Sequence, residues 1–456
     1  MTFATGCWAP EGRDSIRFPV QKDKPRSVLG LVFLTVFLDI VGFSILFPLF
    51  PAMLEFYFEQ EGPDSLFGGL IETLAGLVDG NEFQVAVLFG GLLGTVYSVL
   101  QFLFAPIWGS LSDRIGRRPT LIVTLIGTLV GYLIWIYSRS FTLLLVARVI
   151  NGIAAGNIST ASAAVADTTT GKDRAKGMGI VGMAIGLGFV VGPAIGGSLF
   201  GIDLSSDAGA DTMLHPFSAA AIAAAALGLI NLLWVLTRFR ETLPPERRGQ
   251  PSERAGIHPF KRLAQLDYPG LKRLNFLYLI YLTAFAAIEF TLTFLAAERF
   301  EYTPRDNMWM FVFVGLVIAF VQGGIVRRVA PKYGEHRVGS IGLILTLPGF
   351  VLIGYAQTET MLYFGLFFMA VGSALVMPCL SALASRYTPA DRQGLSLGVF
   401  RSMGSLARAI GPLAGGALFW WFGSLTPYLV GAGLLLVPVL LSRGLPPIPT
   451  AAEDAE

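Results

Sequence analysis

Twelve segments of about 20 mostly apolar residues recur along this 456-residue chain, and each is long enough to cross a bilayer as a helix. Backbone N–H and C=O groups in lipid must bond one another, so apolar stretches of this kind have to be helical. The sequence therefore predicts an all-α membrane protein. The expected spans lie near 28–54, 85–108, 120–138, 141–166, 177–199, 215–237, 274–297, 307–326, 338–356, 361–384, 395–420 and 427–442.

Composition supports this class and argues against others. Only 14% of the residues are charged, against about 25% in a soluble domain. A net charge of +2 without a long basic run argues against nucleic acid as a partner. Cys7 and Cys379 lie in different kinds of segment, so no disulfide framework is expected. The hydrophilic first 27 residues do not resemble a cleaved signal peptide, so the first span should remain in the protein.

The basic residues between the spans predict the orientation in the membrane. If the leader is cytoplasmic, that side carries 27 of the 33 Lys and Arg residues and the other side carries three, Arg139, Arg299 and Arg305. Basic residues accumulate on the cytoplasmic side of membrane proteins. Both termini are therefore expected in the cytoplasm, which for a bacterial protein means the cell (inner) membrane.

A repeat divides the spans into two groups of six. Gly192-Pro193-Ala-Ile-Gly196-Gly197 in the fifth span recurs 219 residues later as Gly411-Pro412-Leu-Ala-Gly-Gly in the eleventh. Internal repeats of this kind are typical of transporters. The expected organisation is a cytoplasmic leader (1–27), a six-helix bundle (28–237), a cytoplasmic linker (238–273), a second pseudo-symmetric bundle (274–442) and a cytoplasmic tail (443–456).

The loop between the second and third spans carries a dense motif of glycine, acid and arginine. Glycine lets backbones approach closely, and an aspartate can accept charge-assisted hydrogen bonds from arginine. We expect this loop to act as a gating loop. Its candidate residues are Gly109, Asp113, Arg114, Gly116, Arg117 and Arg118.

With this loop, the chain resembles the major facilitator superfamily over nearly its whole length. Two further features carry the resemblance: Arg148 in the fourth span, and an antiporter-type helix with its echo, comprising Gly188, Gly192, Pro193, Gly196, Gly197, Gly411 and Pro412. The first span around Asp39 and the segment Glu241-Thr242-Leu243-Pro244 resemble the tetracycline-exporter branch of the twelve-span drug–proton antiporters. Segments around Gln101, Glu289, Pro378 and Arg401 resemble the tetracycline transporter-like organic-anion exporters of animals in that branch.

Five ionisable side chains fall inside predicted spans, where a charge costs about 2.5–3.5 kcal/mol or more. Asp39 and Glu289 are candidate proton carriers, one in each half, and Arg148 is a third proton-coupling candidate that could pair with Asp39. The alternative is a permanent structural ion pair. The remaining two charges, Arg401 and Arg408, lie two helical turns apart on one face and suit an anionic group.

The same two arginines head the list of candidate substrate-binding residues, which adds the buried amides Gln101, Gln322 and Asn151. Amides in spans also commonly bond between helices. The glycines of the fifth span are expected to pack against the opposite half near Gly411 and Pro412. The two bundles would then rock around a central site. A weaker second latch is expected from Gly323 to Arg337, with Tyr333 where the motif has an acid.

We expect a monomeric secondary transporter that uses no cofactor or metal and is not an enzyme. Its expected partners are a small-molecule substrate, protons and the lipid bilayer. Export of small amphipathic organic compounds, drug-like compounds or organic anions, in exchange for protons is the leading hypothesis. The alternatives are a uniporter or proton symporter of a metabolite, and a non-transporting membrane interaction protein or lipid scramblase. The third and ninth spans lack the acids of tetracycline exporters, which argues against metal-chelated tetracycline as substrate.

Overall fold

The computed structural model describes residues 25–61, 82–169, 171–207, 214–248, 268–388 and 393–447, with isolated positions between 62 and 81. Outside the described residues lie Cys7, most of the predicted leader, much of the linker and the end of the tail. The described part of the chain is helical and contains no strand.

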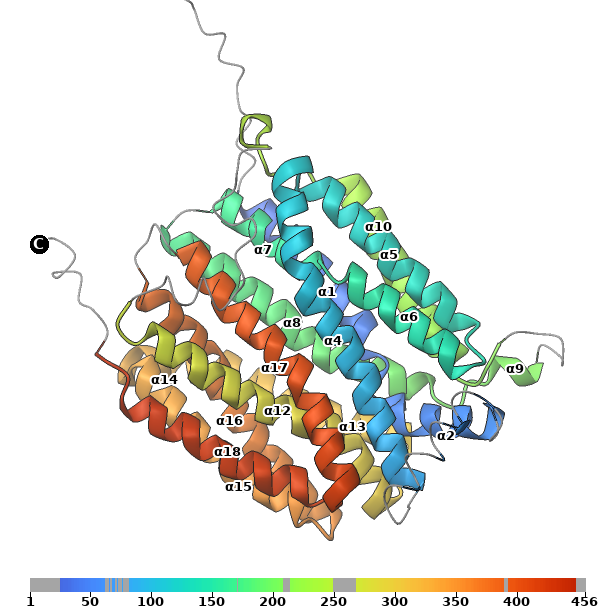
Figure 1. Cartoon of the computed structure of the whole chain (residues 1–456). Helices are drawn as coiled ribbons and strands as arrows, with labels where there is room; N and C mark the ends of the chain where they lie inside the picture. The colour runs from blue at the N-terminus through green and yellow to red at the C-terminus, as the bar shows by residue number, and fades with distance from the viewer. Residues whose placement is uncertain are drawn as a thin grey trace, which may run out of the picture.

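The N-terminal half (to Arg248) has a run of long helices with short connections (Figure 1). Its elements are α1 (Pro25–Ser44), η1 (Phe47–Leu49), α2 (Phe50–Glu61), α4 (Glu82–Ile115), α5 (Arg117–Ile136), α6 (Phe141–Ala154), α7 (Asn157–Thr168), α8 (Gly171–Leu199), α9 (Leu204–Asp207), α10 (Ser218–Arg238) and η2 (Pro245–Arg247).

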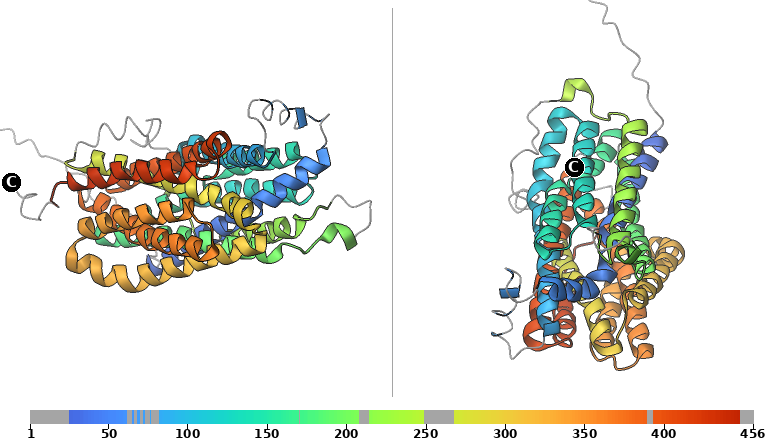
Figure 2. Two further views of the ribbon diagram at one scale, coloured as in Figure 1. Left: turned by 90° about the horizontal axis from the view of Figure 1, so that it is seen from below. Right: turned by 90° about the vertical axis from the view of Figure 1, so that its right-hand side faces the viewer.

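The C-terminal half (from Leu271) repeats this plan. Its elements are α12 (Leu271–Phe300), α13 (Pro304–Phe320), the π-helical turn η3 (Val321–Val326), α14 (Arg327–Tyr333), α15 (Glu335–Gly354), α16 (Glu359–Arg386), α17 (Gln393–Phe422) and α18 (Thr426–Arg443). Figure 2 shows the blue-to-green helices of the first half beside the yellow-to-red helices of the second.

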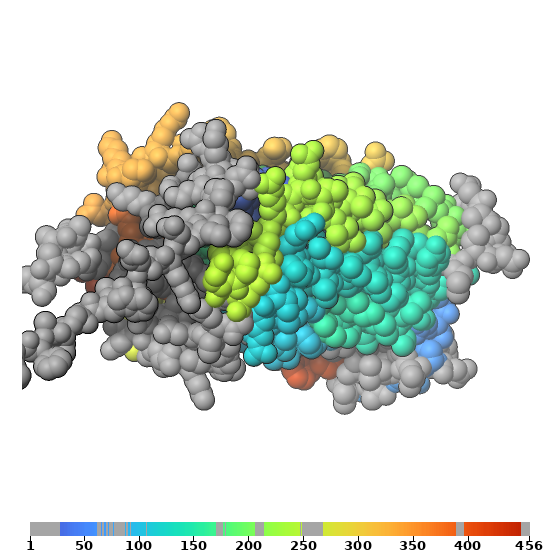
Figure 3. All heavy atoms as spheres, turned by 90° about the horizontal axis from the view of Figure 1, so that it is seen from above, coloured from blue at the N-terminus to red at the C-terminus, as the bar shows by residue number. Residues whose placement is uncertain are grey.

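Ten helical segments of the described chain are long and apolar enough to cross a membrane. The other two long helices, α4 and α17, lie where the second and eleventh spans are predicted. Figure 3 views a face where α5 and α10 lie side by side. Large apolar side chains are exposed on these two helices, as a lipid-facing surface requires; they include Val123, Ile126, Val130, Leu133, Ile222, Leu229 and Ile230. The protein is therefore an integral multi-pass membrane protein.

The predicted first and fourth spans are each interrupted. Pro48 and Pro51 lack the N–H that would continue α1, so the chain turns at Ile45–Leu46 before η1 and α2. In the fourth span α6 ends at Ala154 and α7 begins at Asn157, and Gly156 between them packs against the Trp108 indole. Interrupted spans of this kind line sites within transporters.

The glycine-rich helices confirm the repeat in space, but their packing corrects the expected contact. Gly192 and Gly196 of α8 lie against the Val41 and Ile45 carbonyls of α1, within their own half. In the same way Gly411 and Gly415 of α17 lie against α12. The expected packing of α8 glycines on the opposite half is therefore wrong, with one exception, Gly197. These glycines leave a strip of α8 without side chains, and α1 of the same half packs closely against that strip.

The halves meet through two residues of the predicted set, Gly197 and Pro412, and through small residues outside it. Gly91 and Gly94 of α4 pack against Pro412 of α17, and Gly197 of α8 packs against Pro304 and Met308 of α13. Gly315 of α13 packs against Val190 of α8. These contacts lie toward the face that carries α2, which we call the far face. The opposite face, with the 109–118 loop, is called the loop face.

Candidate functional site

A cavity of about 1150 Å³ lies between the two halves and reaches the loop face. We call it the central cavity. Helices α4, α7 and α8 line it from one half, and α12, η3, α16 and α17 line it from the other. Four of the predicted substrate-binding residues line it: Gln101, Gln322, Arg401 and Arg408.

The fifth predicted substrate-binding residue lies elsewhere. Asn151 is buried between α6 and α5, where its amide packs against Gly131. It does not line the central cavity. Helical periodicity places a residue on a face of its helix, but only tertiary packing decides which neighbour that face meets. The prediction of substrate contact for Asn151 is not supported in this conformation.

Arg401 links the two halves across the central cavity. Its Nη1 donates a hydrogen bond to Ser162 Oγ on α7. The Ser162 hydroxyl in turn donates to the Ile158 carbonyl at 2.6 Å. The arginine predicted from the eleventh span therefore reaches the wall formed by the fourth span, where an anion in the cavity would compete for it.

Arg408 faces two cavities. It lines the central cavity and also a small cavity of about 50 Å³ toward the far face. Its guanidinium lies over the Phe189 ring at 4.8 Å from the ring centroid. Its Nε is buried and has no hydrogen-bond partner. A buried donor without a partner is costly, so Arg408 is suited to accept an anionic ligand.

The small cavity is mainly aromatic and holds one carboxyl group. Glu289 lines it together with Phe43, Phe47, Phe50, Phe189 and Phe290. Its volume admits water but not an aromatic ring, which needs a cavity of about 150 Å³. These five phenylalanines, which we call the Phe layer, close the path from the central cavity to the far face. Glu289 lies within that closed part.

Asp39 does not pair with Arg148 in this conformation. The Asn157 Nδ2 donates to Asp39 Oδ1 at 2.8 Å, and Thr124 Oγ1 donates to Asn157 Oδ1. Because Asn157 is the first residue of α7, the interruption of the fourth span brings this amide to Asp39. Asp39 lines neither of the two cavities.

Arg148 is buried on α6, with 2% of its surface exposed. Its guanidinium lies over the Trp135 ring at 5.4 Å from the centroid, and Nε and Nη2 have no hydrogen-bond partner. The side chains of Tyr132, Tyr97 and Tyr57 lie close enough to interact with this guanidinium electrostatically. A buried guanidinium with unused donors is a candidate to gain a partner in another conformation.

Asp39 and Glu289 are not symmetry equivalents, although α1 and α12 are. Pairing Val41 with Thr283 and Ile45 with Ala287, which contact equivalent glycines, puts Tyr281 at the place of Asp39. The same register puts Phe47 at the place of Glu289, two helical turns nearer the far face. The two carboxyls thus lie on corresponding helices of the two halves, as expected, but at different heights along them.

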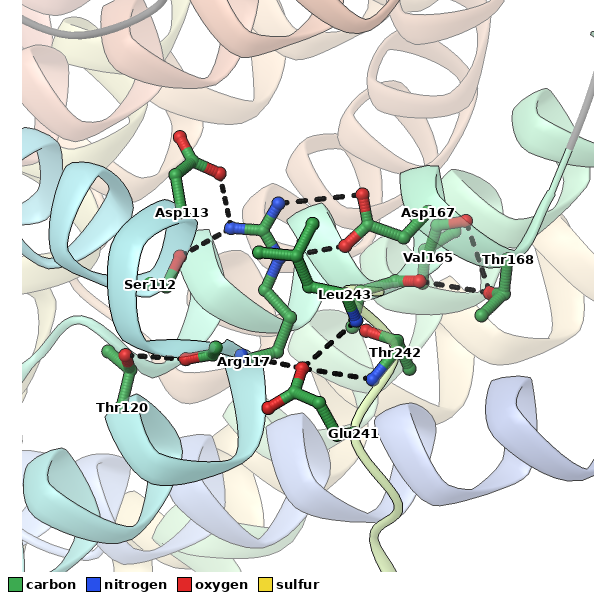
Figure 4. A network of polar contacts seen from close by, with 12 residues as sticks. Ser112, Asp113, Arg117, Thr120, Val165, Asp167, Thr168, Glu241, Thr242 and Leu243 are labelled. Carbon is green, nitrogen blue, oxygen red and sulfur yellow. Dashed lines mark hydrogen bonds and ion pairs between the residues drawn. The ribbon is translucent and has the colours of Figure 1, made fainter. Parts of the chain in front are cut away.

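The gating loop is held inside the N-terminal half by Arg117, whose side chain is 2% exposed (Figure 4). Its Nη1 donates to Asp113 Oδ1 at 2.5 Å and to Ser112 Oγ at 2.6 Å. Its Nε donates to Asp167 Oδ2 at 2.7 Å. Arg117 thus ties the end of α4 to the end of α7. Asp113, Arg117 and Gly109 line the mouth of the central cavity.

Glu241 caps the start of α5 in the same network. Its carboxylate accepts from the Arg117 N–H at 2.9 Å and the Arg118 N–H at 3.2 Å. Acids at a helix N-terminus bond its free N–H groups and complement the helix dipole. Gly116 has φ +111°, and a Cβ there would collide with Glu241. Glycine is required at this position for both reasons.

The two remaining arginines of the loop differ in their surroundings. Arg118 Nη2 donates to the Leu236 carbonyl at the end of α10, at 2.7 Å. Arg114 is exposed at the end of α4. Only Arg117 of the three lies in the core of the network.

The C-terminal latch has the opposite charge order. At the start of α15, after Gly334, stands Glu335, which binds Arg386 at the end of α16 at 2.9 Å. The N-terminal half has arginine at the start of α5 and aspartate at the end of α7. Tyr333 occupies the position where the sequence motif has an acid, and the acid of this latch, Glu335, stands two residues later. Sequence reasoning missed Glu335, Arg386 and Asp167, whose visible signal was their place at span ends on one face.

The comparisons with known proteins agree with this geometry. The model of the Major Facilitator Superfamily matches residues 32–332 and 326–456. The human major facilitator superfamily domain-containing protein 10 is 35% identical over 96% of this chain and 97% of its own length. The class B tetracycline resistance protein of Escherichia coli is 27% identical over 89% of this chain and 92% of its own.

Solved structures show the same fold. The crystal structure of the human organic anion transporter MFSD10 (TETRAN) matches with a TM-score of 0.75, at 35% identity, covering 92% of this chain and 100% of that one. An inward-facing bacterial homologue of the lysosomal transporter Spinster matches with a TM-score of 0.67, at 16% identity over 92% of this chain and 97% of that one. These relatives are transporters rather than enzymes. The chain belongs to the major facilitator superfamily, among relatives of the tetracycline-resistance and MFSD10 proteins.

Proposed function

We propose that this transporter carries small amphipathic organic anions by alternating access and couples their movement to protons. The observation that carries the proposal is the charge of the central cavity. The acids that line it among the described residues, Asp113 and Glu335, are bound to Arg117 and Arg386. Arg408 lines the cavity and keeps one buried donor, its Nε, without a hydrogen-bond partner.

The rest of the wall favours an amphipathic substrate. Apolar side chains such as Met183, Leu282 and Met377 line the cavity beside Arg401 and Arg408. Tyr278 and Phe400 stack with their ring centroids 3.9 Å apart at the same wall. An organic anion would place its charged group at the arginines and its apolar part against this surface.

The arrangement of the halves supports alternating access. The cavity reaches the loop face, while small residues and the Phe layer close the far face. The loop face is the cytoplasmic face in our proposal, because the basic residues gather there. Rocking of the halves would open the far face and close the mouth at Asp113 and Arg117. Of the three residues that the sequence suggests for proton coupling, Glu289 lines the same small cavity as Arg408, and we propose that it carries the proton. Asp39 and Arg148 line neither cavity and are not needed for this step.

The relatives support the substrate class. A protein titled an organic anion transporter shares 35% identity with this chain. The tetracycline resistance proteins are more distant at 27% identity. We therefore propose organic anions as the substrate class. We propose export as the direction, with the substrate entering the cavity from the loop face.

Proteoliposomes test the proposal. Purified protein is reconstituted and efflux of naphthalene-2-sulfonate is followed with and without a pH gradient. We expect wild type to move the sulfonate, Arg408→Gln to lose more than about tenfold in rate and Arg408→Lys to retain part of it. Arg305→Gln, an exposed arginine on the far face, is the matched control and should behave as wild type.

Three outcomes would contradict the proposal. Equal transport by wild type and Arg408→Gln would place the anion elsewhere. Flipping of a labelled phospholipid with no sulfonate movement would favour the scramblase alternative, and transport indifferent to any pH gradient would favour a uniporter.

A further inference from the structure

Glu289 and Arg408 come from neighbouring helices and face the same small cavity. Glu289 is on α12 and Arg408 on α17, and both line it. They do not form a direct ion pair in this conformation, and the carboxyl group keeps its place beside a water-sized space. Arg408 is also the residue that reaches into the central cavity. One arginine thus stands between a carboxyl group and the proposed anion site.

Two influences act on the Glu289 carboxylate: its burial first, and the Arg408 guanidinium second. Arg408 is the charged residue that acts on the carboxylate, among those described. Other titratable groups lie on the helices around this site. Tyr97 on α4 interacts electrostatically with Asp39 and Arg408, and Tyr281 on α12 interacts with Glu289. On α18, Tyr428 feels Arg299 and Glu298, near the far face. On α17, Arg401 lies two helical turns from Arg408 and acts with it on Tyr278.

The sign of the coupling follows from these charges. A carboxylate at Glu289 attracts Arg408 and repels an anion that approaches the same guanidinium. Protonation of Glu289 removes that repulsion and leaves Arg408 uncompensated, so the anion binds more tightly. Interactions between charges are stronger in a low-dielectric interior than in water. By linkage, the bound anion must raise the proton affinity of the site by the same factor.

We propose that a proton on Glu289 and an organic anion on Arg408 bind cooperatively, so that this site carries the two together rather than exchanging one for the other. The inference rests on the proposed function and selects its coupling mode. It corresponds to the symport alternative that the sequence left open. For an anionic substrate, exchange for protons would need another group whose protonation weakens anion binding.

Asp39 does not supply this coupling in the present geometry. Its carboxylate accepts a hydrogen bond from Asn157 and lines neither cavity. Asp39→Asn is therefore the matched control for Glu289→Gln. Both substitutions remove one intramembrane carboxylate, but only one of them lies beside Arg408.

The test measures binding of naphthalene-2-sulfonate to protein in nanodiscs by calorimetry at about pH 6 and about pH 8. A sulfonate stays ionised over this range, so any pH dependence belongs to the protein. We expect wild type to bind about fivefold more tightly at the lower pH. Glu289→Gln should bind with the tighter affinity at both values, and Asp39→Asn should keep the wild-type pH response.

A second measurement needs no variant. Sulfonate added to wild type in weakly buffered solution with a pH indicator should cause proton uptake. Proton release, weaker binding at the lower pH, or an unchanged pH response in Glu289→Gln would overturn the inference. Wild-type affinity in both Arg408→Gln and Arg408→Lys, or no sulfonate binding by wild type, would instead overturn the proposed function itself.

Discussion

The N-terminal half holds its intramembrane charges between its own helices, whereas the C-terminal half turns them toward the cavities. Asp39 is bound by Asn157, and Arg148 lies over Trp135. In the other half, Glu289, Arg401 and Arg408 all line a cavity. The helices repeat, but the positions of the charges do not. One bundle is therefore built as a support and the other carries the binding groups.

The latches on the loop face differ in the same way. Arg117 is buried among two carboxylates and a serine, and Glu241 closes the network from behind. The equivalent pair in the second half, Arg386 with Glu335, has its arginine side chain 51% exposed. Burial decides how much each pair contributes to stability, because water competes with an exposed pair.

The largest predicted effect compares these arginines. Arg117→Gln leaves the partly buried carboxylates of Asp113 and Asp167 without their shared partner and should cost about 3 kcal/mol. Arg386→Gln breaks an exposed pair and should cost about 1 kcal/mol or less. Thermal unfolding of the two purified variants in one detergent measures the difference. Equal losses would show that the two latches are energetically alike.

A second comparison concerns the glycines that precede the two latches. Gly116→Ala places a side chain at φ +111° and against Glu241, so we expect a loss of about 2–3 kcal/mol. Gly334→Ala has φ +85° but open space around the new methyl group, so the loss should be about 1 kcal/mol. The melting temperatures should follow that order. A reversal would mean that the Gly116 backbone relaxes around the added methyl group.

A third prediction separates the buried arginine from the cavity arginine. Arg401→Gln removes a donor from the central cavity and should weaken sulfonate binding about tenfold, or about 1.4 kcal/mol. Arg148→Gln changes a residue that does not line either cavity, so the affinity of its folded fraction should stay near that of wild type. Calorimetry on monodisperse protein measures both. Weaker binding by Arg148→Gln alone would reverse the roles assigned to the two halves.

The smallest predicted effect lies at the far face, where the loop before α10 contains His215. Its Nε2 bonds the Trp135 carbonyl at 2.8 Å and its Nδ1 accepts from the Phe217 N–H at 3.3 Å. Burial lowers the pKa of His215 below its ordinary value of 6.5. The unfolded chain therefore binds this proton more readily than the folded one. The free energy of unfolding is therefore unaffected by His215 above about pH 6.5, where the ring is neutral in both states, and it decreases as the pH falls below that value.

The corresponding region of the other half has an arginine instead of a histidine. Arg299 donates to the Gly354 carbonyl at 2.6 Å and the Ala356 carbonyl at 3.0 Å. Melting curves between about pH 8 and about pH 5 should lose part of their pH dependence in His215→Gln and keep it in Arg299→Gln. An unchanged pH dependence in His215→Gln would show that other groups cause it.

Much of the fold could be predicted because a bilayer imposes simple rules on a sequence. The apolar windows correspond to the long helices, and the G-P-x-x-G-G repeat corresponds to equivalent contacts of α8 with α1 and α17 with α12. The interruptions at Ile45–Leu46 and Ala155–Gly156 were not predicted. Hydropathy does not register a break in a span when the residues on either side remain apolar.

The site was predicted less completely. Four of five candidate substrate-binding residues line the central cavity, but Asn151 packs against Gly131 instead. Ser162 had no signal of its own, since it becomes a partner of Arg401 only through the packing of distant spans. The motif in the gating loop was visible, yet its chief partners are supplied by the ends of α7 and α10.

The sequence by itself determined the membrane class, the long spans, the repeat of two halves and the presence of five costly charges within the spans. These follow from local composition, because each span must satisfy its own backbone in lipid. Only the tertiary structure decided which charges share a cavity. That choice depends on helix rotation and register. Asp39 therefore accepts a hydrogen bond from Asn157, while Glu289 lines the same cavity as Arg408.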